Sequence, residues 1–191
     1  MSALLDRFIP KPDRGKRHGT VVRAPADLVL DVARNFDLQS VPLVRAIFWL
    51  RHKILRAKEP LPARGMGLVA LTQGIGWGVL VDEPGAYVSG AACQPWEADV
   101  RFCAIPAEQF TTYFEPDRVK VVWSLEVEAI EPGLTRFCTE TRVMATDESA
   151  RAKFRRYWRV FGVGIVMVRW LVLPAVRRCA ERQWLARRGG T

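Results

Sequence analysis

Hydrophobic and polar residues alternate most clearly in two neighbouring segments in the second half of the chain. One face of residues 119–130 carries Val121, Trp123, Leu125, Val127 and Ala129, and the other carries Lys120, Ser124, Glu126 and Glu128. One face of residues 134–144 carries Phe137, Thr139, Thr141 and Val143, and the other carries Arg136, Cys138, Glu140 and Arg142. A period of two predicts strands with one buried and one wet face. Glu131-Pro132-Gly133 predicts the turn that pairs them, which lets the two arginines face the two glutamates.

Helical spacing dominates on either side of these strands. A helix is expected to start at Pro25 and another after Pro42, because proline at the first helical position loses no hydrogen bond. A long helix follows Thr146, Asp147 or Ser149, each of which is a suitable cap. Its apolar stripe consists of Phe154, Tyr157 or Trp158, Phe161, Ile165, Val168 and Leu171 or Val172. Pro174 predicts a kink or an interruption before a last basic stretch, residues 175–185.

The remaining elements complete an α+β fold. Further strands are predicted over residues 18–23, 68–73, 77–82 and 87–94, with a short helix over 106–114. The order of strand, two helices, antiparallel strands and one long helix predicts a curved meander wrapped around the C-terminal helix. The lack of repeats and linkers favours a single domain over residues 1–191, with an N-terminal leader (1–14) and a frayed basic tail (186–191).

The positive charge belongs to the C-terminal segment. The chain has a formal net charge of +9, yet residues 149–191 hold eleven basic residues against one acid, Glu181. Such a segment can lie against phosphate, an anionic membrane surface or an acidic partner, or it can be a solvated helix face. A deep apolar stripe on the same helix, without a known nucleic-acid motif, argues against nucleic acid as a partner.

Several classes of protein are disfavoured by local sequence features. The most apolar run, residues 160–168, ends at Arg159 and Arg169, so no membrane-spanning helix is predicted. Asp6 and Arg7 stand where a signal peptide needs apolar residues, which favours a cytoplasmic protein. The four cysteines (Cys93, Cys103, Cys138 and Cys179) lack metal-site spacing and are predicted to be reduced and mostly buried. The glycine-rich run 74–78 opens no helix and carries no phosphate-loop lysine, so nucleotide binding is not expected. No metal and no cofactor are predicted.

Three short stretches carry a family resemblance. They are Val21-Val22-Arg23-Ala24-Pro25-Ala26, Lys120-Val121-Val122-Trp123, and the run Thr139-Glu140-Thr141-Arg142-Val143 with Ala145-Thr146-Asp147, which leads into Phe154-Arg155-Arg156-Tyr157-Trp158. Over residues 15–185 the chain resembles the START-like, helix-grip superfamily of polyketide cyclases/dehydrases, lipid-transfer proteins and the major birch-pollen allergen. The pattern is that of uncharacterised bacterial members. The resemblance implies a cavity for an apolar ligand between the sheet and the C-terminal helix.

The hydrophobic pattern agrees with this on the residues that line such a cavity. The predicted inward residues are Trp77, Val79, Trp123, Leu125, Val127, Phe137, Phe154, Trp158, Phe161 and Ile165. Polar groups that could orient a ligand are Thr139, Thr141, Tyr87 and Tyr157. Two interpretations stay open: these residues line a cavity, or they fill a solid core, since aromatic residues at these spacings also form solid cores.

Candidate catalytic groups are few. His18 and His52 stand among basic residues and are predicted to be exposed. Glu140 and Arg142 are expected to form a solvent-side ion pair, but a shift of one residue would turn both into the cavity as an acid or base and an anion-binding group. Tyr157 is a third candidate, as a proton donor.

The favoured function is therefore binding or carriage of a hydrophobic, lipid- or polyketide-like small molecule. The alternatives are a cyclase/dehydratase-type enzyme that uses the same cavity, or an interaction protein whose basic helix docks to an anionic membrane. The sequence leaves the ligand and the oligomeric state open.

Overall fold

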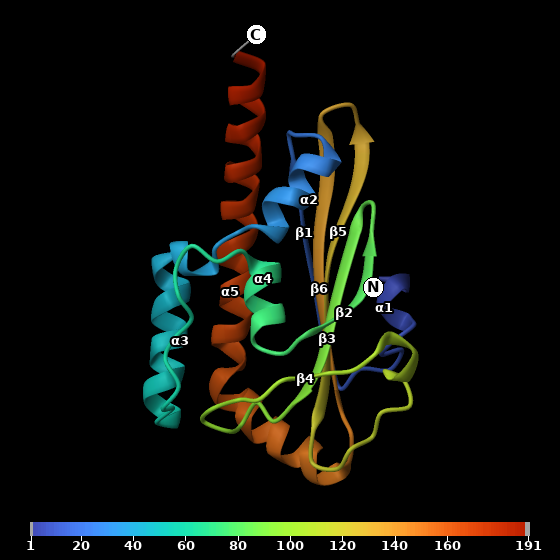
Figure 1. Ribbon diagram of the computed structural model, residues 1–191, viewed down its shortest axis with the longest axis vertical. Helices are drawn as coiled ribbons and strands as arrows, with labels where there is room; N and C mark the ends of the chain where they lie inside the picture. Colours follow the sequence, from blue (N-terminus) through green and yellow to red (C-terminus); the bar gives the residue numbers. More distant parts are fainter. Residues whose placement is uncertain (1, 190–191) are drawn as a thin grey trace.

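An open antiparallel sheet forms one layer of the molecule. The computed structural model describes residues 2–189. Its strands are β1 (Arg14–Val22), β2 (Gly78–Glu83), β3 (Ala86–Cys93), β4 (Cys103–Ala104), β5 (Val119–Glu131) and β6 (Leu134–Ala145). They are arranged in the order β1-β6-β5-β3-β2, with β4 paired to β3 (Figure 1). Glu128 pairs with Arg136 across the β5–β6 hairpin as predicted, but Glu126 lies opposite Cys138 and Arg142 lies opposite Val122, so the second predicted pair is wrong.

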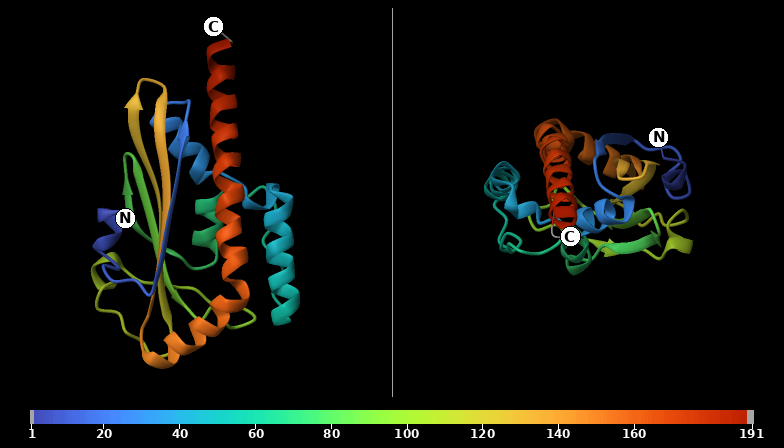
Figure 2. Two further views of the ribbon diagram at one scale, coloured as in Figure 1. Left: turned by 180° about the vertical axis from the view of Figure 1, so that it is seen from behind. Right: turned by 90° about the horizontal axis from the view of Figure 1, so that it is seen from above.

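The long helix covers one face of this sheet. The helices are α1 (Ala3–Asp6), α2 (Ala26–Arg34), α3 (Pro42–Leu55), α4 (Leu68–Gly74) and α5 (Glu148–Gly189), with short 3₁₀ turns at Leu38–Ser40 and Ala107–Gln109. Helix α5 lies between the sheet and α3 (Figure 2). Two helices after the first strand, a meander and a long C-terminal helix make up a helix-grip fold, so the predicted fold class is confirmed.

Two predicted elements are wrong in type or length. Residues 68–73 form helix α4 and not a strand. Leu68 and Val69 pack against the core beside α2, and Leu71, three residues after Leu68, is buried as well. A segment of seven residues is short enough to fit either period. The helix expected over residues 106–114 is only the 3₁₀ turn at Ala107–Gln109.

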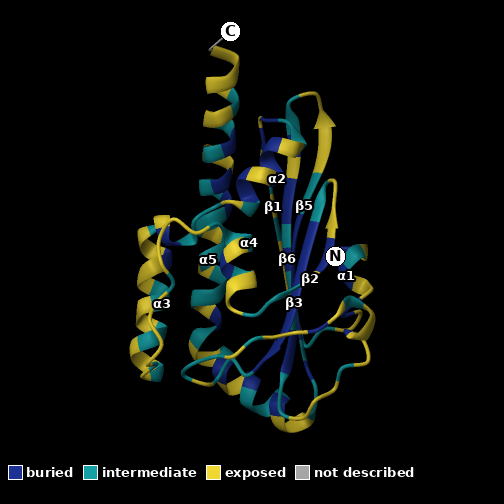
Figure 3. Ribbon diagram, in the orientation of Figure 1, coloured by how far each residue is buried: buried dark blue, intermediate teal, exposed yellow. Residues whose placement is uncertain are grey.

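The two faces of the sheet have different covers. On the α5 side, Tyr87, Trp123, Leu125 and Phe137 pack with α2 and with the second half of α5 into a solid core. On the opposite side, Leu5, Phe8 and Ile9 from the N-terminal segment pack against Val88, Phe110 and Val122. The face predicted to be wet is therefore covered along its centre, where Figure 3 shows the strands as buried.

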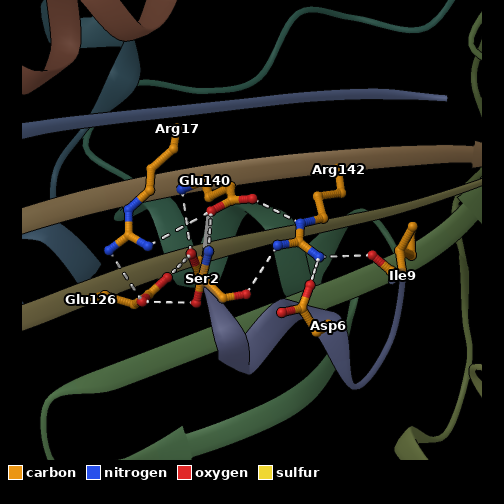
Figure 4. A network of polar contacts seen from close by, with 8 residues as sticks. Ser2, Asp6, Ile9, Arg17, Glu126, Glu140 and Arg142 are labelled. Atoms are coloured by element: carbon orange, nitrogen blue, oxygen red, sulfur yellow. Dashed lines mark hydrogen bonds and ion pairs between the residues drawn. The ribbon is translucent and has the colours of Figure 1, made fainter. Parts of the chain in front are cut away.

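A buried polar network joins the N-terminal segment to β6 (Figure 4). Arg142 Nε donates to Glu140 Oε1 at 2.7 Å, while its two Nη atoms donate to Asp6 Oδ1, Ile9 O and Ser2 O at 2.6–2.9 Å. The backbone N–H of Ser2 donates to Glu140 Oε2 at 2.7 Å. Glu140 and Arg142 are 1% and 0% exposed. The expected solvent-side location of this ion pair is therefore wrong.

A second buried cation holds the loop before β5. The Lys120 side chain donates to the carbonyls of Phe110 and Thr111 at 2.9 and 3.2 Å. It also lies 4.4 Å from the centroid of the Phe114 ring. Burial lowers the pKa of Lys120 to about 8.

Helix α5 differs from its prediction at Pro174. Asp147 caps the helix by accepting a hydrogen bond from the Ala150 N–H at 2.7 Å, as proposed. The helix then runs through Pro174 without interruption, because Leu173 and Val176 on either side of it are buried against α2. Gly190 and Thr191 of the expected frayed tail lie outside the described residues.

The prediction that no helix could span a membrane is also wrong, as judged by the length and composition of α5 alone. Within residues 2–189, α5 is long and apolar enough to cross a bilayer, and only 17% of its most apolar window is buried. In this structure the helix instead packs along the sheet, α2 and α3.

The buried network predicts a large difference between two arginines on the same strand. Arg142→Met should lower the free energy of unfolding by about 3–5 kcal/mol, because it leaves the Glu140 carboxylate buried without its main partner. The matched control is Arg136→Met, which breaks the exposed pair with Glu128 and should cost less than about 1 kcal/mol. Urea titration of both variants measures the difference, and equal losses would contradict the role assigned to Arg142.

Candidate functional site

The sheet and α5 border a partly open cavity next to the solid core. Its volume is about 480 Å³. The lining residues are Arg14, Gly15, Lys16, Trp77, Cys93, Pro95, Phe102, Val121, Thr141, Val143, Phe154, Tyr157, Trp158, Ile165 and Arg169. Strand β1 is one of the edge strands of the sheet, and at this edge the cavity is bordered by β1 and by α5.

Aromatic rings form much of the wall. On α5, the Phe154 ring centroid lies 5.6 Å from Trp158 and 6.4 Å from Tyr157. These rings gather because residues three and four apart share one face of a helix. On the opposite wall, Trp77 and Phe102 lie 5.1 Å apart. The wall is therefore mostly apolar and suited to a hydrophobic ligand.

The structure divides the predicted lining residues into two groups. The residues that line the cavity are Trp77, Thr141, Phe154, Trp158 and Ile165, together with Tyr157. The residues that lie outside it are Val79, Tyr87, Trp123, Leu125, Val127, Phe137, Thr139 and Phe161. Most of this second group belongs to the solid core beside α2, while Val79 is 42% exposed. Both interpretations of the aromatic residues therefore hold, each in a different half of the sheet: some residues line a cavity, and the others form a solid core.

Basic groups at the cavity were missed by the sequence analysis. Arg169 lines it from α5, and no acceptor among residues 2–189 lies within hydrogen-bond distance of its guanidinium. Burial lowers the pKa of Arg169 to about 10, so the group stays charged at neutral pH. Arg14 and Lys16 line the cavity from β1. None of the described residues that line it is acidic.

Signals for these residues were present in the sequence. Arg169 follows Ile165 by four positions, which places both on the same side of a helix. Arg14 and Lys16 alternate with His18 on one face of a strand, and the predicted strand began only at His18. His18 is half-buried and not exposed, with its ring 6.5 Å from that of Trp170. Burial, Arg169 and Lys16 lower the pKa of His18.

Of the three catalytic candidates, only Tyr157 lies at the cavity. Glu140 and Arg142 lie on the opposite face of β6 from Thr141 and Val143, which line the cavity. The alternative phase that would turn them inward is therefore wrong. Tyr157 does line the cavity, and its hydroxyl accepts a 3.4 Å hydrogen bond from Arg51 Nε of α3.

The cysteines are free and unevenly buried. Cys93 and Cys138 are buried, Cys179 is intermediate, and Cys103 is exposed, contrary to the general expectation of burial. Burial raises the pKa of the Cys93 thiol to about 12, so this cavity residue is protonated at neutral pH. Within residues 2–189 no group of three or more His, Cys, Asp or Glu side chains is placed to hold a metal ion.

Comparison with solved structures finds proteins that match most of the chain, with low sequence identity and low TM-scores. No family model and no curated protein matches the chain. The Zhui aromatase/cyclase of a Streptomyces species is 15% identical with a TM-score of 0.32, over 89% of this chain and 94% of that chain. A hypothetical protein from Helicobacter pylori is 10% identical with a TM-score of 0.37, over 92% and 90% of the two chains. CalU16 from Micromonospora echinospora is 13% identical with a TM-score of 0.30, over 91% and 87%. These TM-scores are too low to transfer a function.

The burial of Cys93 predicts how the four thiols react. Iodoacetamide at mildly alkaline pH should alkylate Cys103 at least about 100-fold faster than Cys93, because only the thiolate reacts and burial keeps Cys93 protonated. Time-resolved peptide mass spectrometry measures both rates in one sample. Unfolded protein is the control and should show similar rates. Equal rates in folded protein would mean that the inner cavity wall is open to bulk water.

Proposed function

We propose that the protein binds a hydrophobic small molecule that carries an anionic group, such as an acidic lipid or polyketide, in the cavity between the sheet and α5. The observation that carries this proposal is Arg169. A charged, partly buried guanidinium lines an otherwise largely aromatic and aliphatic cavity, and no acceptor among the described residues lies within hydrogen-bond distance of it.

The energetics of a partly buried charge support an anionic ligand. Arg169 is partly buried, and the Glu140 carboxylate offsets only part of its desolvation. A charge held partly away from water without a hydrogen-bonding partner carries a free-energy cost that calls for compensation. A carboxylate or phosphate supplies that compensation, since it accepts two parallel hydrogen bonds from a guanidinium. Because Arg14 and Lys16 border the same cavity and no acid lines it, the local charge also attracts an anion.

The size of the cavity agrees with this class of ligand. A volume of about 480 Å³ lies within the usual range for small-molecule sites, roughly 300–1,000 Å³. Aromatic rings around Phe154 and the side chains of Val121 and Ile165 offer contact for a hydrocarbon chain or a fused-ring body. Binding and carriage require nothing further of the site.

Calorimetric titration tests the proposal, with dodecanoate below its micellar concentration and dodecanol below its solubility limit. Wild-type protein should bind dodecanoate more tightly than dodecanol. Arg169→Met should weaken dodecanoate binding at least tenfold, about 1.4 kcal/mol, because it removes the charge that pairs with the carboxylate. It should leave dodecanol binding nearly unchanged, because the apolar wall remains.

Arg182→Met is the matched control, since Arg182 is an exposed arginine farther along α5 that does not line the cavity. This variant should bind both compounds as the wild type does. Failure of wild-type protein to bind either compound would contradict a hydrophobic site. Equal loss of both compounds in Arg169→Met would contradict the charge-pairing role of Arg169.

A further inference from the structure

One side of α5, next to the β1 edge of the sheet and not covered by α3, exposes large apolar residues. Val160, Val163 and Trp170 are 63%, 71% and 70% exposed, and Met167 is 40% exposed. They stand three or four residues apart and therefore form one stripe. Val163, Met167 and Trp170 of this stripe border an apolar groove of about 680 Å³, together with Lys16 and Trp158. Figure 3 shows that much of α5 is exposed or only partly buried beside the buried strands.

Arginines stand at both ends of this stripe. Arg155, Arg156 and Arg159 precede it, and Arg177 and Arg178 follow it; all five are exposed. The first three, together with Arg14, border a basic depression of about 410 Å³. None of these five has a carboxylate partner among residues 2–189. We call the stripe and these five arginines the outer face of α5.

We propose that the outer face of α5 docks the protein on an anionic membrane surface. The apolar stripe would enter the boundary between headgroups and acyl chains, while the arginines at its two ends contact lipid phosphates. A helix with an apolar stripe and basic flanks has this preference because burial of apolar area and attraction to anionic lipid add together. Long arginine side chains reach the headgroups while their stems stay in apolar surroundings.

The charges argue against a second copy of the chain as the occupant. In a two-fold dimer through this stripe with the helices antiparallel, the arginines before the stripe would face those after it on the other copy. Glu181 is the one acid in the C-terminal segment, and it accepts a hydrogen bond from the Arg23 N–H. Like charges would therefore meet at both ends of such an interface, whereas an anionic lipid surface neutralises them.

The packing of α5 favours docking over crossing. The side of the helix opposite the stripe holds Phe154, Leu173 and Val176, which are buried against the sheet and α2. A helix that crossed the bilayer would lose these contacts. A helix that lies on the surface keeps all of them and buries only the face that is exposed here.

The outer face also adjoins the cavity. Trp158 borders the cavity, the apolar groove and the basic depression. Lys16 borders the cavity and the groove. A docked protein would therefore hold one border of its cavity next to the lipid. The docking proposal does not depend on cavity binding, because the outer face is exposed whether or not the cavity is filled.

Sedimentation with phosphatidylcholine vesicles, with and without phosphatidylglycerol, tests the docking. The full chain should bind only the vesicles that contain phosphatidylglycerol and should be released by high salt, which screens exposed charges. Trp170→Ser should weaken binding roughly tenfold or more through lost apolar burial. Replacing Arg155, Arg156 and Arg159 with Gln should weaken it roughly 100-fold, at about fivefold for each arginine.

Matched controls lie on the other side of the sheet. Ile130→Ser removes a large apolar residue, 40% exposed, near the β5–β6 turn. Replacing Arg7, Lys11 and Arg136 with Gln removes the same charge as the triple variant. Both controls should bind vesicles as the wild type does. All variants should keep the circular dichroism spectrum and the urea midpoint of the wild type, which shows that they fold whether or not the cavity binds dodecanoate.

Any of the following results would overturn the proposal. The first is that wild-type protein fails to bind the anionic vesicles, or that the outer-face and control variants weaken binding equally. The second is a concentration-dependent dimer, seen by analytical ultracentrifugation, that Trp170→Ser dissociates, because a second copy would then cover this face. The third is vesicle-bound protein that resists both high salt and alkaline carbonate, because α5 would then cross the bilayer.

Discussion

The alternation of side chains along β6 is the constraint on which the rest of the structure depends. Thr141 and Val143 point to α5 and line the cavity, while Glu140 and Arg142 point to the N-terminal segment and are buried in its polar network. A slip of one residue would exchange the two sets. The hydrogen bonds of Arg142 to that segment favour the observed register, so this network on the far face also maintains the cavity wall.

Charge is divided between the faces in the same way. Glu140 and Glu126 lie on the far face, near Arg17, and neither lines the cavity. The cavity face holds Arg14, Lys16 and Arg169 instead. A basic site with aromatic walls follows from this division. Helix α5 contributes to two surfaces at once, the cavity wall on its inner side and the exposed apolar stripe on its outer side.

Local patterns predicted most of the fold. Alternation found β5 and β6, and the prolines located the starts of α2 and α3, because these signals depend only on neighbouring residues. The identity of α4 depended on packing against α2, which a short segment does not encode. The candidate site was harder to predict. Which aromatic residues enclose space and which fill it depends on where α2 lies on the sheet, and the sequence alone does not place α2.

The most direct test of the ligand-binding account is a crystal structure of the protein with ω-bromododecanoate, in which anomalous scattering locates the bromine. The account predicts the carboxylate within hydrogen-bond distance of Arg169 and the bromine among the apolar cavity residues, in contact with side chains such as Phe102 or Phe154. A bromine found only on the outer face of α5, or an empty cavity at saturating ligand, would contradict it.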